Sequence, residues 1–291
     1  MLFTYPLMTA VQSVSARVGR TTGRGLAGNM RQHCPTWLLT SVVILLLTAN
    51  AINIGADLGA MADASRLVAG GPQALYVLLF GAICIVLQIF LQYTRYVSVL
   101  KWLTLFLLAY VATMFMAKVS WLDALRSFVV PSVRLDKDYL TTVVAVLGTT
   151  ISPYLFFWQA SQEVEDLKAG PTRRILRRAP EQAEGALNRI HLDTLVGMGI
   201  SNFIALAILI TAAATLHAGG VTDIQTTAQA AQALRPMAGP FAETIFALGV
   251  IGTGLLSVPV LAGSAAYAVG EARKCRPVSP AGRWKPKRFM P

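Results

Sequence analysis

The sequence predicts an all-α, multi-pass transmembrane helical bundle. Of its 291 residues, 55% are hydrophobic and only 13% are charged, whereas charged residues make up about 25% of an ordinary soluble domain. Several apolar runs reach about 18 to 22 residues, which is enough to cross about 30 Å of hydrocarbon at about 1.5 Å per residue. Helices buried inside soluble proteins rarely run so long without charge.

Run length and the charges that bound each run predict seven hydrophobic segments. In chain order they are Leu2–Ala16, Leu38–Ala60, Ala74–Tyr93, Val97–Ala117, Tyr139–Gln159, Leu195–Leu216 and Phe241–Val269. The first segment is short for a span and starts at the initiator Met, as if its beginning were missing. The transmembrane domain therefore covers residues 1–271, and residues 272–291 form a basic, Pro-rich tail that we expect to be disordered.

The formal net charge of +11 reflects membrane topology rather than nucleic-acid binding. The basic residues lie in short segments after the first, third and fifth hydrophobic runs and in the tail. The alternate loops are poorer in net positive charge: two carry a single arginine each, and in the loop after the fourth run four basic residues are offset by three aspartates. By the positive-inside rule, the basic loops and the tail are cytoplasmic. We expect a multi-pass protein of the inner membrane, with a cytoplasmic linker over residues 168–193. The N-terminus then lies on the outer side, which is a second sign of a missing upstream helix.

The second segment carries three polar residues, Asn50, Asn53 and Asp57, at helical spacing. Positions i, i+3 and i+7 share one face of a helix. A carboxylate at membrane depth costs about 2.5 to 3.5 kcal/mol to insert, and it usually faces a cavity or a partner. These side chains could line a proton or ion pathway. Alternatively, Asp57 lies near the outer interface and the asparagines hydrogen-bond between helices.

The fifth segment carries the run Gly148-Thr-Thr-Ile-Ser-Pro-Tyr154. Proline inside a helix removes a backbone donor and clashes with the preceding turn, so the helix kinks or breaks near Ser152 and Pro153. Hydroxyl groups can satisfy the freed backbone or line an opening. Broken helices at the membrane midplane build substrate sites in many secondary transporters, although a simple kink also fits. The acidic end of this segment, with Glu165 and Asp166, favours a helix that reaches cytoplasmic water.

Other chemistry has little support in the sequence. Cys34, Cys84 and Cys275 are far apart and show no metal-type spacing. The glycines of the last segment fit close packing between helices. The sequence contains no nucleotide loop, zinc motif or catalytic triad, so we expect a protein that is not an enzyme and binds no permanent cofactor.

Four stretches resemble the Nramp family of proton-coupled divalent metal transporters. They are YPLMTAVQSVSARVGRTTGRG from Tyr5, TANAINIGADLGAM from Thr48, GTTISPYLFFWQ from Gly148 and ALGVIGTGLLSVPVLAGSAAYAVGEA from Ala247. The resemblance implies a LeuT-like fold of two inverted five-helix repeats, of which this chain matches the second to eighth helices. No DPG-type motif of the family's first helix occurs, and the family pattern stops near Glu271. The resemblance thus implies an incomplete, partial LeuT-like chain.

The resemblance also assigns roles to particular residues. Asp57 falls in the family's SDIQEV-type stretch on the proton route, where a glutamate three residues later is Ala60 here. In the broken helix, Pro153 is retained, Ser152 replaces a methionine, and Tyr154 and Gln159 occupy two histidine positions. Thr149 matches a position whose backbone carbonyl binds metal.

The departure at residue 152 bears on the choice of metal. A methionine sulfur favours soft and borderline ions, whereas the hydroxyl of Ser152 offers only oxygen, which suits Mg²⁺, Mn²⁺ or Ca²⁺. The function implied is membrane transport of divalent cations of the Mn/Fe/Mg type, coupled to protons. Its partners would be the lipid bilayer, the metal ions and protons. The alternatives are a LeuT-fold transporter of amino acids or other solutes, and a non-transporting membrane remnant of a transporter.

Overall fold

The computed structural model describes residues 4–90, 102, 105–116, 119, 121, 136–169, 172–217, 230–231 and 239–273. Within these residues the secondary structure is helical, without a strand. The first half of the chain forms α1 (Thr4–Thr22), α2 (Leu26–His33), α3 (Thr36–Ala69), α4 (Gln73–Phe90), η1 (Leu105–Leu107) and α6 (Leu108–Met116). The second half forms α8 (Lys137–Thr150), α9 (Pro153–Ala169), η2 (Pro180–Gln182), α10 (Ala183–Ala212), η3 (Ala213–His217), η4 (Gly239–Phe241) and α13 (Ala242–Ala272).

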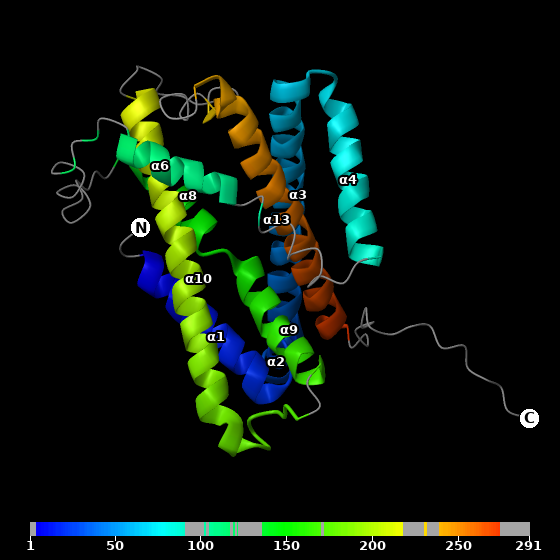
Figure 1. Cartoon of the computed structure of the whole chain (residues 1–291). Helices are drawn as coiled ribbons and strands as arrows, with labels where there is room; N and C mark the ends of the chain where they lie inside the picture. The colour runs from blue at the N-terminus through cyan, green and yellow to red at the C-terminus, as the bar shows by residue number, and fades with distance from the viewer. Residues whose placement is uncertain are drawn as a thin grey trace, which may run out of the picture.

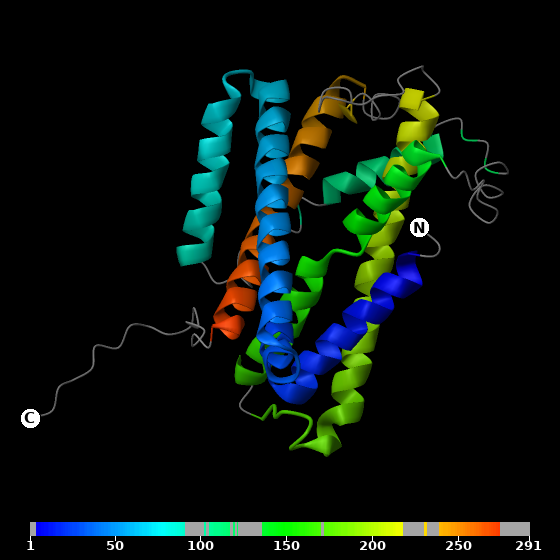
Figure 2. The same ribbon diagram turned by 180° about the vertical axis from the view of Figure 1, so that it is seen from behind.

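The all-α transmembrane prediction is confirmed. Five stretches of the described chain are long and apolar enough to span a membrane: Thr36–Ala69, Gln73–Phe90, Tyr139–Lys168, Pro180–Leu216 and Ala242–Ala272. Their outward faces are strongly apolar, with Leu45 of α3 exposed to 69% and Leu78 of α4 to 73%. In water such exposure would be costly, but lipid solvates these side chains. In Figure 2, α4 lies at the outer edge of the bundle beside α3.

The boundaries of several predicted segments differ in the structure. α1 continues to Thr22, so Arg17 and Arg20, which we expected in a loop, belong to a helix. Most of the predicted linker is helical, since α9 runs to Ala169 and α10 starts at Ala183. Of the segment predicted at 97–117, residues 102 and 105–116 are helical, and the other positions lie outside the described residues. Of the predicted tail, Ala272 ends α13 and residues 274–291 lie outside the described residues.

α3 and α13 pack along each other at the centre of the molecule (Figure 1). Small residues allow this approach: a Cβ on Gly254 of α13 would lie 2.5 Å from the sulfur of Met61 on α3. Met61 is fully buried and joins Phe80, Cys84, Leu255 and Val258 in one apolar cluster. The close packing expected of the last segment's glycines is therefore present.

α1 packs between α9 and α10. The contact with α9 is tight, because a Cβ on Gly19 would lie only 2.3 Å from the carbonyl oxygen of Ala160. Unlike α3, α1 buries mainly polar side chains, among them Thr9, Gln12, Ser13 and Arg20. These polar side chains therefore face neighbouring helices and not lipid.

Candidate cation site at a broken helix

The predicted helix break is present and separates α8 from α9. α8 ends at Thr150, Ile151 leaves the helical conformation with φ −106° and ψ 72°, and α9 begins at Pro153. Proline supplies no N–H and suits the first position of a helix. The single apolar stretch Tyr139–Lys168 is therefore two half-helices within one membrane span. Figure 1 shows the backbone changing direction between α8 and α9.

Backbone carbonyl groups are left available at the break. No backbone N–H of the described residues donates to the carbonyl oxygens of Gly148, Thr149 or Thr150. The Ser152 hydroxyl compensates in part, since it donates to the Gly148 oxygen at 3.3 Å and to the Thr149 oxygen at 3.1 Å. The carbonyl oxygen of Thr150 receives neither type of bond from the part of the chain that the structure describes. Carbonyls at the C-terminal end of a helix also carry the negative end of the helix dipole, which favours a cation.

The side chains of Thr149 and Ser152 are placed differently. Ser152 is buried, with 8% of its surface exposed, and its oxygen can accept from one side while it donates to the α8 carbonyls. Thr149 is exposed, and its hydroxyl donates within its own helix to Ala145 and Val146 at 3.0 and 3.1 Å. The oxygen that Thr149 can offer at the break is therefore its carbonyl, while Ser152 can offer its hydroxyl.

The two residues at family histidine positions lie on α9 and take part in helix contacts. Tyr154 is half-buried, and its carbonyl oxygen accepts the Ser264 hydroxyl of α13 at 2.9 Å. Gln159 accepts from the amide of Gln12 on α1 at 3.3 Å, and the same amide reaches the Leu155 carbonyl at 3.4 Å. The first turns of α9 are thus held by α13 on one side and by α1 on the other.

Asp57 and Asn50 face α13, whereas Asn53 does not. The Asp57 carboxylate accepts a hydrogen bond from the Ser257 hydroxyl. Asn50, only 2% exposed, donates to the Leu261 carbonyl at 2.9 Å. Asn53 is exposed, so the structure does not bring it together with Asn50 and Asp57 against α13, and its place on a pathway stays a prediction. The interhelical role considered for the asparagines describes Asn50 well.

α13 links Asp57 to the broken helix. It contacts Asp57 of α3 through Ser257 and the Tyr154 carbonyl of α9 through Ser264. Among the described residues, no group of three His, Cys, Asp or Glu side chains is placed to hold a metal ion. The oxygen atoms that the described residues place at the break are carbonyls and hydroxyls.

Several residues of the site region were missed in the sequence. Ser257 donates a hydrogen bond to Asp57, which lies 200 positions away along the chain. Gln12 donates one to Gln159, which lies 147 positions away. Glu271 of α13 accepts the backbone N–H groups of Gly25 and Gly28 at 3.1 and 2.9 Å and so caps the start of α2. Polar residues at helical spacing inside an apolar segment predict which face of the helix is buried. They do not predict which other helix packs against that face.

The family model for natural resistance-associated macrophage protein-like (Nramp) sequences matches residues 1–283. The chain belongs to the Nramp family. This match covers nearly the whole chain, including the broken helix and the α3–α13 pair just described.

Curated relatives agree with this assignment. The chain is similar to proteins named divalent metal cation transporter MntH from Erwinia tasmaniensis (28% identical over 260 residues), Klebsiella pneumoniae (28% over 258) and Yersinia enterocolitica (30% over 263). Each alignment covers 86% of this chain and 58 or 59% of the relative. The chain therefore spans less than two thirds of the length of the relatives it matches.

Proposed function

We propose that this Nramp-family chain serves divalent metal cation transport and that the break between α8 and α9 binds the cation. The observation that carries the proposal is the set of carbonyl oxygens at Gly148, Thr149 and Thr150, none of which receives a backbone N–H from the described residues. They lie at the negative end of the α8 dipole, inside a membrane-spanning stretch. The names of the MntH relatives favour the same substrate class.

The donors favour a hard cation. The carbonyl oxygen of Thr149 and the hydroxyl of Ser152 would be ligands, and oxygen ligands suit Mg²⁺, Mn²⁺ or Ca²⁺. Helix ends also discriminate by charge: the C-terminal end of α8 favours a cation, while the N-terminal end of α9 favours an anionic group. An amino acid carries both a positive and a negative group, so it could bind between the two helix ends. The uptake assay below therefore includes amino acids as competitors of the metal ion.

We propose further that protons use a route through Asp57. Its carboxylate lies half-buried at the α3–α13 interface, and the same helix α13 contacts Tyr154 at the break through Ser264. Ser257 positions the carboxylate by its hydrogen bond, and Asn50 fixes the same pair of helices. Asn53, three residues after Asn50, is exposed in the described structure, and its part in this route stays a prediction. The orientation that supports uptake places the basic loops and the tail on the cytoplasmic side of the inner membrane.

Uptake into proteoliposomes tests the proposal. We expect Mn²⁺ to enter and unlabelled amino acids not to compete. Pro153→Ala, which allows α8 and α9 to join, should abolish uptake, whereas Pro180→Ala at the exposed start of η2 should leave it unchanged. Equal uptake by the two proline variants would show that the break is not the site. Competition by an amino acid would favour the organic-solute alternative.

A further inference from the structure

Four exposed arginines gather at the end of the bundle where α1 ends and where the chain passes from α9 to α10. We call them the arginine platform: Arg24 after α1, and Arg174, Arg177 and Arg178 between α9 and α10. In the part of the chain that the structure describes, none of the four forms an ion pair with a carboxylate. By contrast, Arg20, Arg173 and Arg189 at the same end all pair with acidic side chains. The platform therefore directs uncompensated positive charge to the outside.

The two segments that carry the platform pack directly against each other. A Cβ on Gly23 would lie 2.7 Å from the Cδ1 atom of Ile175, and Gly23 has a φ of +68°, which favours glycine. The N–H of Leu176 donates to the carbonyl oxygen of Arg20 at 3.4 Å, and the Leu176 side chain is buried. The arginines on either side of this contact therefore belong to one surface.

Hydrogen bonds fix the backbone beneath the arginines. The side chain of Gln182 accepts the N–H of Arg174 at 3.2 Å and donates to the carbonyl oxygen of Thr172 at 3.0 Å. In the other segment, the amide of Asn29 donates to the carbonyl oxygen of Arg24 at 2.9 Å. The platform is thus built on two ordered turns, so that its charges are held near one another.

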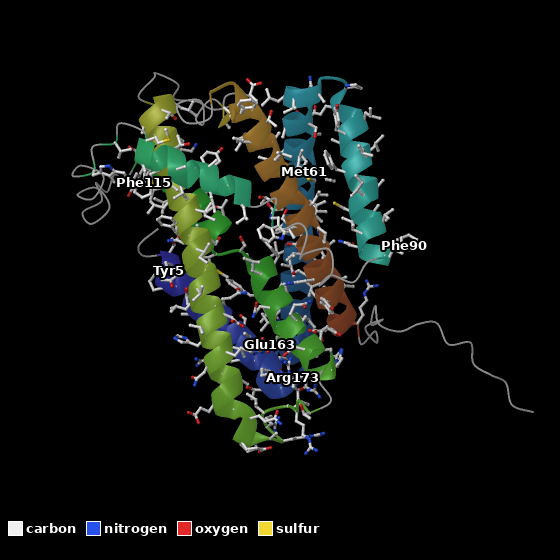
Figure 3. The ribbon with its side chains drawn as sticks, viewed as in Figure 1. Tyr5, Met61, Phe90, Phe115, Glu163 and Arg173 are labelled. Atoms are coloured by element: carbon white, nitrogen blue, oxygen red, sulfur yellow. The ribbon has the colours of Figure 1, made fainter. Side chains whose placement is uncertain are left out.

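The platform lies at a membrane surface. The segment between the spans Tyr139–Lys168 and Pro180–Leu216 turns back at one face of the bilayer. With the α8–α9 break at mid-bilayer, about ten residues of α9 reach the edge of the hydrocarbon, and its last turns cross the headgroup layer. Trp37, which is 69% exposed at the start of α3, is typical of this interface. Figure 3 shows Arg173 at the lower end of the bundle, next to Glu163.

Arginine at this place suits the phosphate of a lipid headgroup. Its planar guanidinium always carries charge and donates two parallel hydrogen bonds to phosphate oxygens. Clusters of four or more basic residues directly beside a membrane span attract anionic lipids. Glu181 and Glu184 follow the platform in the sequence, but neither forms an ion pair with it among the described residues. Four positive charges against two negative ones leave an excess that favours an anion.

We propose that the arginine platform binds the phosphate groups of anionic phospholipids in the leaflet at this end of the bundle. The bound lipid bridges the turn after α1 and the segment between α9 and α10, and it ties both to the bilayer surface. A lipid is favoured over a soluble phosphate because the leaflet holds it beside the platform at a high local concentration. The proposal does not depend on the cation site.

Lipid binding to the purified, detergent-solubilised chain tests the proposal. Short-chain phosphatidylglycerol is the anionic probe, and phosphatidylcholine with the same acyl chains is the zwitterionic comparison. Arg177→Gln removes one platform charge. Arg66→Gln is its matched control, because Arg66 is also exposed, to 47%, but lies at the other end of α3. The triple variant Arg174→Gln/Arg177→Gln/Arg178→Gln removes most of the platform.

We expect saturable binding of phosphatidylglycerol that weakens as salt is added, and at least about tenfold weaker binding of phosphatidylcholine. Arg177→Gln should weaken phosphatidylglycerol binding about fivefold and the triple variant about a hundredfold, while Arg66→Gln leaves it unchanged. Size-exclusion chromatography checks that each variant is folded.

Unchanged affinity in a folded triple variant, or equal binding of the two lipids, would overturn the proposal. Displacement of phosphatidylglycerol by inorganic phosphate at matched concentration would also overturn it, because the platform would then be a site for free phosphate. Mn²⁺ binding, measured on the same samples, reports separately on the proposed function.

Discussion

The pairing of Arg20 with Asp166 predicts an asymmetry between the two partners. Arg20 is 4% exposed, and its ion-pair partner among the described residues is Asp166. Asp166 is 32% exposed and is also reached by Arg173 and Arg189. Asp166→Asn therefore removes the carboxylate that forms the ion pair with a buried guanidinium, whereas Arg20→Gln leaves Asp166 with two other cations. The two variants should differ although each removes the same contact.

The magnitudes follow from burial. Removing one partner of a buried ion pair costs about 3 to 5 kcal/mol, because the other charge stays desolvated. Loss of Arg20 from the partly exposed cluster should cost about 1 kcal/mol. With a shift of about 2 °C per kcal/mol for a chain of this size, Asp166→Asn should lower the Tm by about 6 to 10 °C, and Arg20→Gln by about 2 °C.

Thermal unfolding of the detergent-purified protein, followed by size-exclusion chromatography, measures this difference. The double variant Arg20→Gln/Asp166→Asn should recover most of the loss caused by Asp166→Asn alone, because the stranded charge is gone. Glu165→Gln serves as a control, since Glu165 pairs with Lys168 on its own helix. Equal Tm losses for the two single variants would contradict the prediction that the buried Arg20 depends on Asp166 for its ion pair more than Asp166 depends on Arg20.

Four further predictions concern other contacts. Ser152→Met replaces an oxygen by a soft sulfur ligand and should raise the Cd²⁺/Mg²⁺ uptake ratio; an unchanged ratio would mean that residue 152 does not touch the ion. Asp57→Asn should flatten the pH dependence of uptake in a folded protein, and an unaltered profile would leave Asp57 with a structural role. Glu271→Ala removes the cap of α2 and should cost about 1 to 3 kcal/mol in thermal unfolding, while Glu181→Ala, exposed in η2, should cost little. A reporter that is active only in the cytoplasm should work when fused near Arg178 and fail near Asp223; the reverse pattern would contradict the orientation.

The sequence predicted the parts of the fold that local chemistry dictates. Pro153 lacks an N–H and clashes with the preceding turn, so the break could be placed without a structure. Run length and low charge gave the spans in the same way. By contrast, the C-terminal end of α1 was not predicted. Arg17 and Arg20 look like loop residues in the sequence, because the helices and carboxylates that they contact are not visible there.

The pairing of helices could not be predicted from local pattern. Asp57 and Ser257 lie 200 positions apart, and Arg20 and Asp166 lie 146 apart. Asn53 illustrates the same limit. At about 100° per residue it lies about 60° round the helix from Asn50, which is outside the stripe that α13 covers. The helical spacing of the polar residues predicted approximately which face of α3 is buried. The packing of α13 across α3 determines which residues of that face are covered.

The central claim is that the break between α8 and α9 binds a divalent cation, and Mn²⁺ binding to the purified chain tests it most directly. Electron paramagnetic resonance reports the free ion in a titration of the detergent-solubilised protein. We expect saturable binding that weakens about tenfold or more in Ser152→Ala, in line with losses at other metal sites. Binding should be unchanged in Ser201→Ala, on the exposed face of α10. Equal affinity in the two serine variants, or no saturable binding by the parent chain, would contradict it.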